Sequence, residues 1–73
     1  MARHIIKADI TGTVFKIETS IGAVVDAGAT LVVLESMKME IPVEAPSAGK
    51  VVEIMVVETE AITEGQALVV VEG

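Results

Sequence analysis

A near-repeat in the sequence is the feature that most constrains how this chain of 73 residues can fold. Sliding the chain by 37 positions without a gap places Gly12 on Gly49 and Gly28 on Gly65. Two similar halves of this size would each bury an apolar face only against the other half, which predicts a fold with pseudo-two-fold symmetry. The same shift superimposes Ala8 on Ala45, Val14 on Val51, Ile17 on Ile54, Leu31-Val32-Val33 on Leu68-Val69-Val70, and Glu35 on Glu72.

Length and composition predict a single small all-β domain over residues 1–73. A chain of this size buries only about 60% of the surface that it exposes when unfolded, so little core remains for a deep catalytic cleft. Hydrophobic residues make up 52% of the chain, yet Phe15 is the only aromatic residue, and 13 Val and 8 Ile supply the bulk. Residues branched at Cβ favour strands.

Charge and residue usage exclude several classes of function. The net charge is −6 and the five basic residues are scattered, which argues against a nucleic-acid partner. No cysteine is present, which removes thiol catalysis, and His4 is the only histidine, so we expect neither a metal site nor a catalytic residue. No apolar run approaches the roughly 18 residues of a membrane span, and the start does not resemble a signal peptide. We therefore expect a soluble, cytoplasmic protein that does not bind membranes and is a monomer in isolation.

Short apolar runs bounded by turn-forming residues organise the whole chain, and no segment keeps a helical period. We expect Pro42 at a strand edge, Pro46 in a turn, and glycines where the backbone needs positive φ or a close approach. The expected strands cover residues 4–8, 13–18, 23–25, 30–36, 39–44, 50–57, 60–62 and 67–72.

The two halves meet at a locally unfavourable turn. If strands 30–36 and 39–44 form a hairpin, its two-residue tip is Met37-Lys38, which lacks the glycine that such loops favour. A left-handed conformation costs a residue other than glycine on the order of 1 kcal/mol. A costly sequence on a small domain is more often retained for recognition than for stability.

The residues around this turn carry a family resemblance that spans the chain. Glu35-Ser36-Met37-Lys38-Met39-Glu40 resembles the attachment motif of biotinyl domains, and the match is closest to the stand-alone biotin/lipoyl attachment proteins and to biotin carboxyl carrier domains. Gly12-Thr13-Val14 resembles the family's first turn, and Ala45-Pro46 through Gly49 the turn after the motif. Thr59-Glu60 departs from the family, which has a second Gly-Asp there. The resemblance implies a flattened β-barrel, or barrel-sandwich hybrid, of two four-stranded antiparallel sheets with the lysine on a hairpin.

The resemblance also implies a carrier rather than an enzyme. A biotin protein ligase would join biotin to the ε-amine of Lys38, and the carrier would serve a biotin carboxylase and a carboxyltransferase. We expect Met37 and Met39 to offer flexible apolar contacts, and Glu35 to meet basic groups on the partner enzymes. The chain has no plausible base beside Lys38, so the ligase must deprotonate the amine.

Three alternatives stay open at the level of sequence. Lipoyl domains present a lysine on a similar hairpin, so the cofactor could be lipoate. The chain could also be a structural or protein-binding β module whose lysine is never modified. Met37 and Met39 could be ordinary core residues, because strand alternation would place both on one side. Pseudo-symmetry makes one geometric prediction: both chain termini lie at the end of the domain opposite Lys38.

Overall fold

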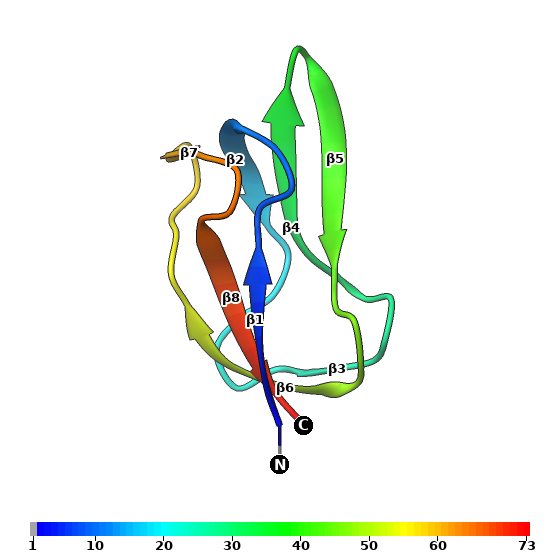
Figure 1. Cartoon of the computed structure of the whole chain (residues 1–73). Helices are drawn as coiled ribbons and strands as arrows, with labels where there is room; N and C mark the ends of the chain where they lie inside the picture. Colours follow the sequence, from blue (N-terminus) through cyan, green and yellow to red (C-terminus); the bar gives the residue numbers. More distant parts are fainter. Residues whose placement is uncertain (1) are drawn as a thin grey trace.

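The computed structural model describes residues 2–73 as two four-stranded antiparallel sheets, and this part of the chain contains no helix (Figure 1). The fold class predicted from the sequence is confirmed, and each expected strand has an observed counterpart. The strand expected over residues 50–57 is too long, because it ends at Ile54. No helix in the described residues could span a membrane. The strands are β1 (Arg3–Lys7), β2 (Gly12–Ile17), β3 (Val24–Val25), β4 (Thr30–Ser36), β5 (Met39–Glu44), β6 (Gly49–Ile54), β7 (Ala61–Ile62) and β8 (Ala67–Glu72).

The two sheets have the same strand arrangement, and each combines strands from both halves of the sequence. Their orders are β1-β8-β6-β3 and β5-β4-β2-β7. A shift of 37 residues converts β1 into β5, β2 into β6, β3 into β7 and β4 into β8, so it turns the first order into the second. Each sheet therefore contains two strands from each half of the sequence. The halves are interlocked, and neither forms a sheet without the other.

The core lies between the sheets and consists of aliphatic side chains. No buried polar or charged side chain occurs among the described residues. Phe15 is not part of the core, because 48% of it is exposed. Side chains branched at Cβ fill the thin space between two sheets in few rotamers, which suits the composition of this chain. The largest fully buried side chains are Leu31, Leu34, Leu68, Val14, Val32, Val51, Val69 and Val71.

The glycine pairs of the repeat perform matched tasks, as predicted. Gly28 and Gly65 have φ of +88° and +90°, which only glycine adopts at little cost. Gly12 and Gly49 allow close approach instead. A Cβ atom on Gly49 would lie 2.7 Å from the carbonyl oxygen of Glu72, and one on Gly12 would collide with that of Glu35.

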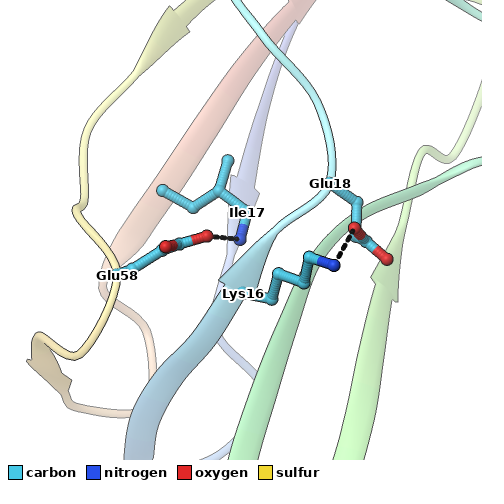
Figure 2. Close-up of polar contacts among 4 residues, drawn as sticks. All are labelled: Lys16, Ile17, Glu18 and Glu58. Carbon is cyan, nitrogen blue, oxygen red and sulfur yellow. Dashed lines mark hydrogen bonds and ion pairs between the residues drawn. The ribbon is translucent and has the colours of Figure 1, made fainter.

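The repeat fails at Thr59, which stands where the first half has Gly22. Gly22 has φ of +93° and Thr59 has φ of +73°, so the two loops share a left-handed backbone although only one contains glycine. Three hydrogen bonds hold the second loop against β2. The Thr59 N–H donates to the Val14 carbonyl at 2.7 Å, and the Val14 N–H donates to the Glu60 carbonyl at 2.9 Å. The Ile17 N–H donates to the Glu58 carboxylate at 3.1 Å (Figure 2). The departure of Thr59-Glu60 from the family pattern thus leaves the loop's course unchanged and adds strain.

The two ends of the described range 2–73 lie opposite the hairpin that carries Lys38, as predicted (Figure 1). Ala2 and Gly73 exchange two backbone hydrogen bonds of 2.9 Å. The shift of 37 residues maps this pair onto Met39 and Ser36, which close the Lys38 turn. The two ends of the pseudo-symmetric domain therefore differ in one respect: one is closed by a turn and the other holds the termini.

Candidate functional site

Four lysines are exposed in the structure, so exposure alone does not select one. Lys7, Lys16 and Lys50 lie within strands, and Lys16 pairs with Glu18 at 3.7 Å (Figure 2). Lys38 alone lies on a turn, at the tip of the β4–β5 hairpin (Figure 1). Of the residues that the structure describes, none lies beyond this tip in Figure 1. The fold thus presents one lysine separately from the others.

The turn has the strained backbone that the sequence predicted. Strands β4 and β5 stay paired up to Ser36 and Met39, which leaves two residues for the loop. Met37 and Lys38 have φ of +54° and +65°. Two successive left-handed residues match the right-handed twist of the flanking strands, which is why such loops usually contain Asn-Gly. Here two ordinary residues accept this conformation, at on the order of 1 kcal/mol each.

Met37 and Met39 are surface residues, so the alternative that they fill the core is wrong. Met37 is 92% exposed and Met39 is 64% exposed. The alternation argument fails because Met37 belongs to the turn rather than to a strand. Met39 pairs with Ser36 at the very end of the sheet, past the last fully buried side chain of β4, Leu34. Two flexible apolar side chains therefore flank the lysine in solvent.

Glu35 and Glu40 lie directly opposite each other, one on each strand of the hairpin. Both are exposed, and they face away from the core because the neighbouring pair, Leu34 and Ile41, points inward. Two like charges in a cross-strand pair repel each other. Counting back from a two-residue turn would have revealed this opposition in the sequence, but it was not recognised there.

Lys38 has no ion pair and no side-chain hydrogen bond with any residue in the range 2–73. The salt bridges of this part of the chain join Arg3 to Glu72 and Lys16 to Glu18. Neither Glu35 nor Glu40 forms one with the Lys38 ammonium, despite their nearness in sequence. No base of the described chain is therefore in place to deprotonate the amine.

Strand β2 braces the hairpin close to its turn. Thr13 pairs with Glu35, and Gly12 packs so closely on the Glu35 carbonyl that a side chain there would collide with it. The sequence indicated a close approach at Gly12 without indicating its partner. Gly12 therefore supports the strand that leads into the turn, and so helps to fix the backbone position from which the Lys38 side chain extends.

The remaining candidates for chemistry stay apart. No group of three or more His, Asp or Glu side chains is arranged to hold a metal within residues 2–73. His4 lies on β1 opposite Val71. An open groove of about 370 Å³ lies between β1 and β5, and its apolar side chains include Ile6, Ile10 and Ile41.

Comparison with known proteins identifies the family. The family described as biotin-requiring enzyme, of the biotin/lipoyl type, matches residues 4–71. The chain belongs to this family. Its members of this kind are carrier domains, so the chain is a carrier and not itself a catalyst. In the structure, the Lys38 amine lies exposed on a projecting turn and has no ion pair with residues 2–73.

Similar proteins include both small and large ones. The chain is 39% identical over 66 residues to the Biotinylated protein TB7.3 homolog of Mycobacterium leprae, covering 90% of this chain and 93% of that protein. It is 33% identical to the Biotin/lipoyl attachment protein of Bacillus subtilis, covering 86% of each. It is 38% identical to the mitochondrial methylcrotonoyl-CoA carboxylase subunit alpha of Arabidopsis thaliana, covering 93% of this chain but only 9% of that protein.

Solved structures agree in fold. A single-chain, multi-domain long-chain acyl-CoA carboxylase matches with a TM-score of 0.88 and 37% identity, over 93% of this chain and 7% of that chain. The urea carboxylase of Kluyveromyces lactis matches with a TM-score of 0.92 and 26% identity, over 99% of this chain and 6% of that chain. The similarity to these long proteins is therefore confined to a segment of the size of this domain.

Proposed function

We propose that this chain is a biotin carboxyl carrier domain that a biotin protein ligase modifies on Lys38. One observation carries the proposal: of four exposed lysines, only Lys38 lies on a turn, and that turn keeps two residues in a left-handed backbone without glycine. A ligase cleft can enclose a lysine at a projecting tip but not one within a flat strand. The similarity to biotinylated proteins and to carboxylases supports biotin as the group attached.

In this proposal Lys38 supplies the amine that is modified, and the backbone of the turn positions it. The Lys38 amine forms an amide bond with the biotin carboxyl carbon as the bond from that carbon to an activating AMP group, supplied by ATP on the ligase, breaks and AMP leaves. The ligase takes up the proton, since residues 2–73 place no base beside the amine. Bound biotin supplies a site that accepts a carboxyl group at a biotin carboxylase and releases it at a carboxyltransferase. The two-residue turn restricts the direction in which the Lys38 side chain leaves the domain.

The neighbouring side chains serve recognition. Met37 and Met39 expose flexible, polarizable surface that a ligase pocket can cover, which removes apolar area from water. The opposed carboxylates of Glu35 and Glu40 repel each other in the free protein, so a basic group on a partner enzyme that approaches both relieves this repulsion.

Intact mass after incubation with a ligase tests the proposal. The protein is treated with biotin, ATP and biotin protein ligase, and separately with lipoate, ATP and lipoate ligase. We expect a single biotin adduct, its loss in Lys38→Arg, and its retention in the matched control Lys50→Arg. A guanidinium cannot supply the acylated amine, whereas Lys50 lies on β6. A lipoyl adduct alone, or no adduct with either ligase, contradicts the proposal.

A further inference from the structure

Two pseudo-equivalent strands, β1 and β5, form the long open edges of the two sheets. Each has a neighbouring strand on one side only among the described residues. The opposite edges, β3 and β7, contain two residues each. Open edges offer unpaired N–H and C=O groups to another strand, and proteins usually block them. Because the two halves are otherwise matched, a difference between β1 and β5 points to a difference in use.

Strand β5 is blocked. In an antiparallel ladder, residue pairs that exchange hydrogen bonds alternate with pairs whose N–H and C=O groups point outward. A two-residue turn is closed by a hydrogen-bonded pair, here Ser36 and Met39, so Pro42 opposite Val33 belongs to the outward-pointing set. Its nitrogen has no hydrogen to offer at the open edge. Glu40 and Glu44 flank Pro42 on the same side of the strand.

Strand β1 is open at the equivalent place. The hydrogen-bonded pair of Ala2 with Gly73 fixes the phase of its ladder, so Arg3 and Ile5 direct their N–H and C=O groups outward. Ile5 occupies the position of Pro42, and its side chain is 56% exposed. The edge therefore keeps the backbone donor that β5 lacks, beside an exposed apolar side chain.

The charge at the two edges is reversed. Arg3 and Lys7 flank Ile5 on β1, where β5 has Glu40 and Glu44. The pairing register places Lys50 on the same face as Arg3, with Glu72 between them. Arg3 forms a salt bridge to Glu72 at 3.5 Å, but both side chains are well exposed, and such bridges are weak. In a protein of net charge −6, this edge is where cations gather.

A hollow adjoins the same edge. The groove of about 370 Å³ runs between β1 and β5, and its apolar lining includes Ile6 and Ile10 on one side and Ile41 and Val43 on the other. The charged residues that also line it are Lys7, Asp9 and Glu44. Residues of a strand added to β1 would alternate between the outer face of the sheet and this groove. Main-chain hydrogen bonds together with side-chain pockets are the two components of recognition by strand addition.

We propose that the β1 edge, Arg3–Lys7, is a docking site for an extended segment of a partner protein. The segment pairs antiparallel to β1, with acidic residues opposite Arg3 and Lys7 and apolar residues that alternate with them over the groove. This site is separate from the Lys38 turn, and the inference does not depend on which cofactor Lys38 carries.

A peptide titration tests the inference. The probe is acetyl-Ser-Glu-Ile-Thr-Val-Glu-Ser-amide, which is patterned on residues 40–44 with threonine in place of the proline. It is added to ¹⁵N-labelled protein with amide shifts followed by NMR. We expect changes concentrated at residues 3–7 and around the groove, with a dissociation constant on the order of 1 mM. Changes centred on β5 or the Lys38 turn, or no binding at that concentration, overturn the inference.

Two variants and one control peptide sharpen the test. Ile5→Pro removes the outward N–H, and the fold should accept it because Pro42 holds the equivalent position, which circular dichroism checks. We expect binding about tenfold weaker in this variant, with ligase modification of Lys38 unchanged. The double variant R3E/K7E should prefer the control acetyl-Ser-Lys-Ile-Thr-Val-Lys-Ser-amide. The inference is overturned if the glutamate-containing probe peptide binds folded Ile5→Pro as tightly as it binds the unaltered protein. It is also overturned if the unaltered protein binds the probe and the lysine-containing control peptide equally well.

Discussion

Replacing the turn residues with Asn-Gly should stabilise the domain while abolishing its proposed function. The double variant Met37→Asn/Lys38→Gly places the preferred residues at φ of +54° and +65°. Little packing is lost, because Met37 is 92% exposed and Lys38 makes no side-chain hydrogen bond or ion pair with residues 2–73. The change therefore acts on the backbone strain almost alone.

The size of the effect follows from the two left-handed residues. Relief of strain contributes on the order of 1 kcal/mol at each position. The new glycine offsets roughly 0.5–1 kcal/mol of this gain in stability, because it makes the unfolded chain more flexible. We expect a net gain of about 1 kcal/mol in the free energy of unfolding. In a domain of this size, such a gain raises the melting temperature by about 4–8 °C.

Urea titration and calorimetry measure this gain. The matched control is Lys38→Arg, which also loses the amine but keeps a residue other than glycine in the strained position, so its stability should equal that of the unaltered protein. If the double variant is no more stable than this control, the turn is not strained, and the argument that function retains an unfavourable sequence is wrong.

Three further substitutions probe the same reasoning. Thr59→Gly should raise the free energy of unfolding by about 0.5–1 kcal/mol, because Gly22 adopts the same left-handed backbone in the other half; a decrease in urea midpoint contradicts this. Gly12→Ala should lower stability by about 1–3 kcal/mol, since the added methyl group collides with the Glu35 carbonyl, and an unchanged urea midpoint would refute the close packing. Glu40→Lys should gain about 0.2–1 kcal/mol at low ionic strength by converting a repelling cross-strand pair with Glu35 into an attractive one. That gain should shrink as salt is added during thermal melts, and a gain independent of salt would point to another cause.

Much of the fold was predictable because the sequence contains a near-repeat, so that each half carries the same pattern of strands and turns. The paired glycines carried the strongest information: Gly28 with Gly65, and Gly12 with Gly49, serve matched backbone needs in the structure. The two-residue tip at Met37-Lys38 was predictable because the flanking strands leave no other residues for the loop.

Other features depend on partners that a linear pattern does not name. The exchange of strands between sheets, and the packing of Gly12 on the Glu35 carbonyl, arise from contacts far apart in sequence. The alternative that Met39 is a core residue was wrong. Strand alternation predicts which face of the sheet a residue takes, but it does not predict where along the strand the core ends. The strained backbone at Thr59 was not predicted from the sequence, although the repeat aligns Thr59 with Gly22 and so indicates a left-handed conformation there.

The pseudo-symmetry explains how a strained turn can persist in so small a domain. The hairpin tip and the paired chain ends occupy equivalent positions, so the strain at Met37 and Lys38 lies at the far end of one sheet, away from the fully buried residues. Local strain at such a place costs stability without disturbing the core packing on which both halves depend.

Peptide mapping of the ligase-treated protein tests whether the turn selects Lys38 for modification. All four lysines, Lys7, Lys16, Lys38 and Lys50, are exposed, so exposure does not distinguish them, whereas the backbone geometry of the turn is found only at Lys38. Proteolysis followed by tandem mass spectrometry should find biotin on Lys38 alone, with the other three lysines unmodified. Biotin on a strand lysine, or spread over several lysines, would show that the turn does not select the modified residue.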